Sequence, residues 1–157
     1  MISKKNLLAG VFAAALTTGA FSFAAHAEGD KDLTIYKSPY CGCCSQWSDA
    51  LEDAGFNVTV RDTEDLDTVK RQVGVPENMQ SCHTAVVDGY VMEGHVPLEA
   101  VKRVLAERPD IKGLSVPGMP MGSLGMGEPD ADTNYTVYTL PKASGGQPTV
   151  YQQVSGK

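Results

Sequence analysis

The sequence predicts an α/β protein with one domain, and three observations support this class. The 157 residues are 42% hydrophobic and 20% charged, a composition typical of a globular protein. Segments with β-type alternation are separated by segments with apolar residues at helical spacing. The pair Asp88-Gly89 between two β-prone segments is the strongest short signal for a β-hairpin. A chain of this length and pattern has room for one hydrophobic core.

The first half of the pattern alternates strands with helices. Residues 33–36 alternate and are expected to form a strand, which leads into a turn-rich loop with three cysteines. A helix is expected from Ser45, because the apolar residues after it fall on one face, and Gly55 is expected to end it. A second strand at 58–60 and a second amphipathic helix at 66–73 follow.

The second half begins with the predicted hairpin of 84–87 and 90–92. Pro97 then opens a helix, since proline fits the first helical turn, where its missing N–H has no partner to lose. The order β-α-β-α-β-β-α, with the cysteines between the first strand and helix, predicts a thioredoxin-like α/β sandwich.

Two further segments follow the predicted sandwich. Eight of the 17 residues from 113 to 129 are Gly or Pro, so this segment is expected to be a loop without regular structure. The β-prone segments 135–140 and 149–154 are expected to form a C-terminal hairpin.

The first 27 residues have the three parts of a secretory signal peptide. Lys4 and Lys5 give a positive start, an apolar stretch follows, and Ala25-His26-Ala27 matches the A-x-A cleavage pattern. An uncleaved membrane anchor is the alternative interpretation. We expect cleavage after Ala27, which leaves residues 28–157 as a thioredoxin-like metal-binding domain in the periplasm, without membrane attachment.

The charge and the sulfur content narrow the functional class. A formal net charge of -6 argues against a nucleic-acid-binding protein, which needs a basic face for phosphates. Three of the four cysteines lie within four residues, and three of the six methionines lie within eight. Clustered sulfur in a short chain favours redox or soft-metal chemistry.

The cysteines form a C-x-C-C motif with one distant partner. Cys41 and Cys44 have C-x-x-C spacing at the expected start of a helix, which lowers thiol pKa values and suits both disulfide exchange and metal ligation. Cys43 favours metal, because additional bridging thiolates serve polynuclear Cu(I) sites. The predicted fold brings Cys82 towards these three. Two structural disulfides and a structural zinc site are the alternatives.

Methionines and histidines extend the candidate site. Met119, Met121 and Met126 have Gly and Pro neighbours rather than core partners, and their thioethers select Cu(I) over zinc. An adaptable apolar loop or a partner surface is the alternative. His83 and His95 are candidate imidazole ligands or structural residues, and Glu93 is a candidate to orient His95.

Four separate motifs resemble those of the CopG-like family of periplasmic copper-resistance proteins, over nearly the whole chain from about Leu33 to Val154. The motifs are Tyr40-Cys41-Gly42-Cys43-Cys44, Ser81-Cys82-His83-Thr84, Glu93-Gly94-His95-Val96-Pro97 and the segment 116–123. The resemblance implies a thioredoxin-like fold and copper bound by the C-x-C-C motif, the distant cysteine, a histidine and the methionine loop.

The leading hypothesis is therefore a periplasmic copper-binding protein for copper tolerance, whose thiolates could hold more than one Cu(I). A mixed sulfur and nitrogen site that cycled between Cu(I) and Cu(II) would make it a copper oxidoreductase. The alternative is a thioredoxin-like thiol–disulfide oxidoreductase. A third possibility is a copper chaperone that docks on a copper efflux or delivery protein through the methionine loop.

Overall fold

The computed structural model describes residues 31–143 and 145–156, so the expected signal peptide at 1–27 lies outside the described residues. Seven strands form one sheet: β1 (Asp32–Lys37), β2 (Asn57–Asp62), β3 (His83–Val87), β4 (Tyr90–Glu93), β5 (Gly113–Ser115), β6 (Asn134–Leu140) and β7 (Val150–Ser155). The helices are α1 (Gly42–Asp53), α2 (Leu66–Val73), α3 (Leu98–Glu107) and the short 3-10 helix η1 (Glu77–Met79). Within the described ranges, no helix has the length and apolar character needed to cross a membrane.

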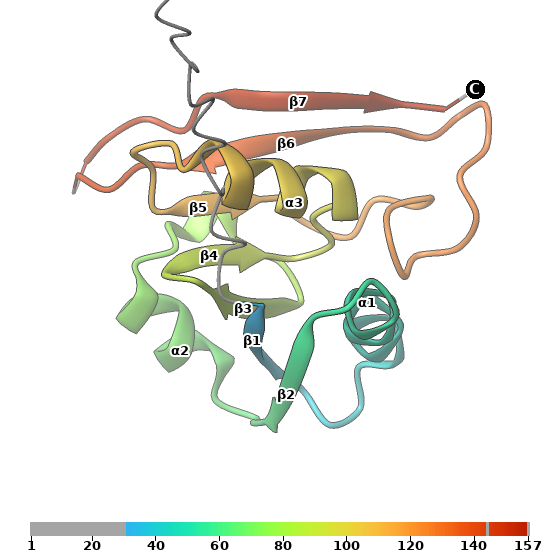
Figure 1. Ribbon diagram of the computed structural model, residues 1–157, viewed down its shortest axis with the longest axis horizontal. Helices are drawn as coiled ribbons and strands as arrows, with labels where there is room; N and C mark the ends of the chain where they lie inside the picture. Colours follow the sequence, from blue (N-terminus) through green and yellow to red (C-terminus); the bar gives the residue numbers. More distant parts are fainter. Residues whose placement is uncertain (1–30, 144, 157) are drawn as a thin grey trace, which may run out of the picture.

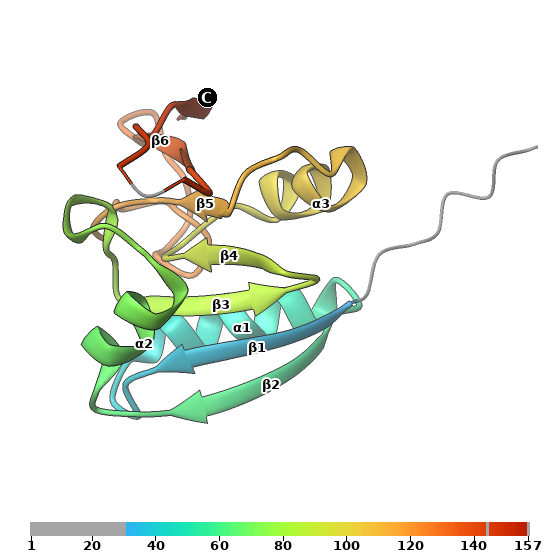
Figure 2. The same cartoon turned by 90° about the vertical axis from the view of Figure 1, so that its left-hand side faces the viewer.

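The sheet has the order β2-β1-β3-β4-β5-β6-β7 (Figures 1 and 2). β1 pairs in parallel with β2 and antiparallel with β3, and β3 and β4 form the hairpin that the sequence predicts. β5 runs parallel to β4, and β6 and β7 form the expected C-terminal hairpin. The predicted α/β class is confirmed, and the element order from which the thioredoxin-like arrangement is predicted is present.

Helices cover both faces of the sheet. Successive side chains of a strand point to opposite faces, so Ala85 and Val87 of β3 join the core cluster with α1 and α3. Thr84 points the other way and contacts Lys70 of α2. In Figure 1, α1 and α2 lie on opposite sides of β1 and β3. Trp47 of α1 is fully buried in the core cluster, and burial of such a side chain stabilises the fold by about 1.5–3 kcal/mol.

The loop expected at 113–129 differs in one respect, because its first three residues form strand β5. Gly113 pairs with Val91, at a position where a Cβ atom would collide with the Val91 backbone, so glycine permits the close approach. Three residues are too few to show an alternating pattern, which is why the sequence does not reveal this strand. β5 connects the C-terminal hairpin to the main sheet.

Candidate metal centre

Three cysteines lie at the start of α1. Cys41 is the N-cap residue, and Cys43 and Cys44 belong to the first turn, so α1 begins three residues before the expected Ser45. Cys41 and Cys44 form a disulfide, with Cα atoms 5.3 Å apart. Cys43 and Cys82 are the free thiols of the described chain. The alternative of two structural disulfides is therefore met for one pair of cysteines and not for the other.

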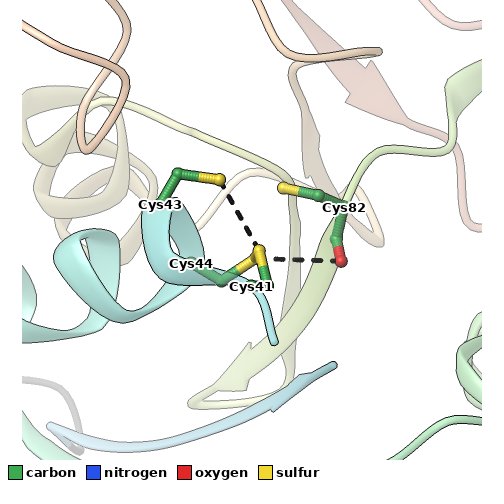
Figure 3. Close-up of side chains that lie close together, drawn as sticks. All are labelled: Cys41, Cys43, Cys44 and Cys82. Atoms are coloured by element: carbon green, nitrogen blue, oxygen red, sulfur yellow. Dashed lines mark hydrogen bonds between the residues drawn. A yellow bond between two sulfur atoms is a disulfide. The ribbon is translucent and has the colours of Figure 1, made fainter. Parts of the chain in front are cut away.

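Cys82 faces these three cysteines from a different part of the chain (Figure 3). The antiparallel pairing of β1 with β3 places His83 opposite Lys37, so Cys82 lies at the sheet end where the cysteine loop begins. The four Sγ atoms all lie within 4.8 Å of one another. The Sγ atoms of Cys41 and Cys43 are 3.5 Å apart, and Cys44 Sγ lies 3.9 Å from the carbonyl oxygen of Cys82. The fold thus assembles all four sulfur atoms in one cluster.

His95 is held with one ring nitrogen facing this cluster. Its Nδ1 lies 2.7 Å from the carbonyl oxygen of Leu124, which can only accept, so Nδ1 carries the proton and donates. Its Nε2 is then unprotonated and lies 3.0 Å from Cys82 Sγ. Burial lowers the pKa of His95, which favours the neutral ring. A neutral imidazole with its other nitrogen held by a carbonyl is the usual form of a metal ligand.

His83 also contacts the Cys82 sulfur atom. Its Nδ1 lies 3.4 Å from Cys82 Sγ, and its ring packs between Trp47 and His95 at centroid distances of 4.7 and 5.1 Å. The side chain is fully buried, and Nε2 has no hydrogen-bond partner within the described chain. Burial above all, with the nearby His95 and Lys70, holds the pKa of His83 well below its ordinary value.

The Cys82 thiol at the centre of these contacts holds its proton firmly. Burial raises its pKa to about 11, so the thiol form dominates at neutral pH. With Nδ1 of His95 committed to Leu124, the thiol donates to Nε2 of His95. A metal ion that takes Cys82 as a ligand has to displace this proton.

Glu93 has a different role from the expected one, because it does not contact His95. It accepts hydrogen bonds from Lys70 Nζ at 2.6 Å and Thr84 Oγ1 at 2.6 Å, and from the Ser81 backbone N–H at 2.7 Å. Lys70 is 3% exposed and Glu93 fully buried. Burial raises the pKa of Glu93, while Lys70 and the other donors oppose that shift. This network anchors Ser81, the residue before Cys82.

Sequence reasoning missed Lys70 and Leu124 as parts of this site. Lys70 could have been suspected, since it lies between Leu66 and Val73 at helical spacing, on the otherwise apolar stripe of α2. Leu124 acts through its carbonyl oxygen, which leaves no signal in residue type.

The methionine loop is attached on both sides of the cluster. Near its start, Gly118 N–H donates to Gln80 at 3.2 Å, and Ser81 Oγ donates to the Gly118 carbonyl. Near its end, Gly125 packs so closely on α1 that a Cβ atom would lie 2.7 Å from the Cys43 carbonyl oxygen. The segment between these glycines therefore spans from the Cys82 side of the cluster to the α1 side.

The three loop methionines differ in exposure. Met119 is 57% exposed and Met121 is 70% exposed, whereas Met126 is half-buried. Met92 is fully buried in the main core, and Met79 lies in a second core cluster. Met119 and Met121 are accordingly not held in the core.

Known proteins share this architecture. A family model described as a protein of unknown function, DUF411, matches residues 79–126, which include Cys82, both histidines and the methionine loop. No curated protein matches the chain. A solved structure titled copper resistance protein CopG, form 1, is 41% identical, with a TM-score of 0.73 over 80% of this chain and 98% of that one. Its form 2 is 41% identical, with a TM-score of 0.72 over 78% and 97%.

The fold and the site define an α/β protein with a thiol and imidazole cluster suited to metal. At this identity and coverage, the chain belongs to the CopG-like family of copper resistance proteins.

Proposed function

We propose that this protein binds Cu(I) as its cargo, in copper resistance and homeostasis outside the cytoplasm. The observation that carries the proposal is the approach of four cysteine Sγ atoms to within 4.8 Å of one another. Thiolate and imidazole are soft to borderline donors that suit Cu(I), and several close thiolates can bridge more than one ion. The similarity to the CopG copper resistance protein supports copper as the metal.

Each part of the cluster has a separate task in this proposal. Cys41, Cys43, Cys44 and Cys82 supply thiolates. His95 supplies Nε2, which the Leu124 carbonyl already orients. Reduction of the Cys41–Cys44 disulfide to two thiols takes two electrons and two protons, so a thiol reductant has to act before all four sulfurs can bind.

The exposed thioethers of Met119 and Met121 offer a first contact for incoming Cu(I), with Met126 nearer the protein interior. A thioether binds Cu(I) without losing a proton, which allows capture before the Cys82 thiol is deprotonated. A copper efflux or delivery protein is the partner that such a loop would serve.

The test is anaerobic metal analysis of the reduced protein after loading with Cu(I) or Zn²⁺ against a competing chelator. We expect more than one Cu(I) per chain, little zinc, and a large loss of Cu(I) in Cys82→Ser. A protein that takes up zinc tightly and ignores Cu(I) contradicts the proposal.

The methionine loop is tested with matched variants. Replacing Met119, Met121 and Met126 together by Leu is expected to slow Cu(I) uptake. Met79→Leu removes the same sulfur from a core cluster outside the loop and is expected to leave uptake unchanged. If the triple variant takes up Cu(I) as fast as the wild type, the loop methionines do not bind incoming Cu(I) and serve only packing or contact with a partner.

Export to the periplasm is the second part of the proposal. It is supported by the signal-like pattern of residues 1–27 and by the disulfide, which an oxidising compartment permits. Cell fractionation and N-terminal sequencing are expected to find a chain that begins at Glu28 outside the cytoplasm. A chain retained in the cytoplasm at full length contradicts this part.

A thiol–disulfide oxidoreductase is the second candidate, favoured by the C-x-x-C disulfide at the start of α1. Cys43 argues against this activity, because it offers the pair a competing thiol. The sequence before Thr84 also argues against it, since Cys82-His83 stand where such enzymes usually carry proline. Reduction of insulin disulfides that survives copper chelation would favour this activity. Its absence from the metal-free, reduced protein would exclude it.

A further inference from the structure

Cys82 belongs to two different groups of metal-binding side chains. One group is formed with Cys41, Cys43 and Cys44, and the other with His83 and His95. In each group the potential ligand atoms all lie within 4.8 Å of one another. One sulfur atom therefore belongs to both donor sets.

The disulfide separates these two sets chemically. Cys41 and Cys44 bind each other, so the first set is left with Cys43 and Cys82 as its free thiols within the described chain. The second set contains neither residue of the disulfide. Its sulfur and its two imidazoles remain complete whether the disulfide is closed or open.

The second set is also held in place before any metal arrives. His83 is the first residue of β3, and its carbonyl accepts from the Gly94 backbone N–H at 2.9 Å. His95 follows Gly94 directly, and Leu124 holds its ring. Trp47 of α1 donates its Nε1–H to the carbonyl of Val96, the residue after His95, at 2.9 Å. His83 therefore lies in β3, and Cys82 and His95 lie just outside the two ends of the β3–β4 hairpin, where these hydrogen bonds hold them.

The chemistry of the second set indicates its ligand. Two imidazoles and one thiolate are the trigonal donor set of mononuclear copper sites that accept both Cu(I) and Cu(II). The His83 atom that faces Cys82 Sγ is Nδ1, at 3.4 Å, while the other ring nitrogen, Nε2, has no hydrogen-bond partner within the described chain although the residue is fully buried. An unsatisfied buried polar group costs stability, and structures usually keep one where it has a function.

We propose that Cys82, His83 and His95 form a mononuclear copper site of their own, which binds one ion while the Cys41–Cys44 disulfide is closed. Reduction of the disulfide adds the thiolate site, with Cys82 as the ligand common to both. The proposal rests on the proposed function for the identity of the metal, and it divides the single composite site into two sites of different redox dependence.

The test compares the disulfide-closed and the reduced forms of the full protein, each verified by mass spectrometry. Co(II) serves as a probe that does not oxidise thiols, and Cu(I) is added anaerobically against a competing chelator. The closed form is expected to bind one Co(II) with thiolate-to-cobalt charge-transfer absorption, and one Cu(I). The reduced form is expected to bind additional Cu(I).

Matched variants identify the ligands. Cys82→Ser and His95→Gln are expected to abolish the cobalt signal of the closed form. Cys43→Ser, the same chemical change in the same cluster, is expected to leave it unchanged. Because His83 is buried in the core, metal binding by His83→Gln is interpreted only if circular dichroism shows that the variant is folded. If His83→Gln unfolds, the other variants decide the result.

The outcomes separate the two proposals. If the closed form binds no metal while the reduced form binds several Cu(I), the separate site is wrong and the proposed function stands. If Cys43→Ser removes the cobalt signal as fully as Cys82→Ser, the separate site is also wrong. If neither form binds Cu(I), the proposed function fails as well.

Discussion

The cysteine-bearing start of α1 and the β3–β4 hairpin supply the two halves of the cluster, and they are built differently. The α1 half carries three sulfurs that are neighbours in sequence, two of which change chemical state with the disulfide. The hairpin half carries Cys82, His83 and His95, whose surroundings are buried and hydrogen-bonded. One half can respond to redox conditions, while the other keeps its donors in a fixed arrangement.

The largest expected effect comes from removing Lys70 from the hydrogen-bond network around the buried Glu93. Lys70→Met leaves the buried Glu93 carboxylate without its cation, which costs about 3–5 kcal/mol of unfolding free energy. Urea denaturation of the metal-free protein measures the loss.

The control is an ion pair beside the α1 half, between Lys37 and Asp62. The Asp62 side chain is 53% exposed, so Asp62→Asn is expected to cost less than about 1 kcal/mol. Similar costs for the two variants would show that the two ion pairs contribute alike.

The second prediction concerns the reactivity of the shared sulfur. Because burial raises the pKa of Cys82 from 9.0 to about 11, its thiolate fraction at pH 8 is about a hundredfold below that of the unfolded chain. Alkylation by iodoacetamide in the metal-free protein, followed by peptide mass spectrometry, is expected to be slowed accordingly. The rate is expected to rise with pH up to about 11. Rapid alkylation at pH 8 would show that Cys82 is not shielded as the fold implies.

The sequence anticipated these two halves to different degrees. The C-x-C-C motif and the Asp88-Gly89 turn are local patterns, and both lie where the sequence predicts. The partners that hold the hairpin half are tertiary: Lys70 lies 23 residues from Glu93, and Leu124 lies 29 residues from His95. Proximity in sequence favours a contact between Glu93 and His95, whereas the fold directs Glu93 to Lys70 and Thr84 on the other face of the sheet.

The third prediction is a pH dependence that arises in the hairpin half. Burial lowers the pKa of both His83 and His95, so the folded protein keeps them neutral while the unfolded chain takes up protons below about pH 6.5. The contribution of the two neutral histidines to the stability of the metal-free protein is therefore present above that pH and is lost as the pH falls. His83 is expected to contribute most of this loss, because burial holds its pKa well below the ordinary value.

Urea denaturation at several pH values measures this loss, and His95→Gln is expected to make the slope shallower. Lys70 also lowers the pKa of His83, and Cys82 Sγ lies beside both rings, so the slope is compared at constant ionic strength. A stability that stays constant from pH 7 to pH 5 would contradict the neutral, buried state of the histidines.

The smallest expected effect is a test of the loop that joins the two halves. Gly118 and Gly125 both have positive φ, at 72° and 84°, so alanine at either position strains the backbone by about 1 kcal/mol. A Cβ atom at Gly118 meets nothing within 4 Å, but one at Gly125 presses on the Cys43 carbonyl and the Trp47 backbone. Gly125→Ala is therefore expected to cost about 1 kcal/mol more than Gly118→Ala.

The two variants also differ in their consequence for His95, because Leu124 precedes Gly125 and its carbonyl fixes the tautomer. Displacement of the loop in Gly125→Ala is expected to release Nδ1, so the ¹⁵N shifts of the ring change towards a mixture of tautomers. Gly118→Ala is expected to retain the Nδ1-protonated form. If both variants keep that form, the orientation of His95 belongs to the hairpin alone, and the loop contributes only cover.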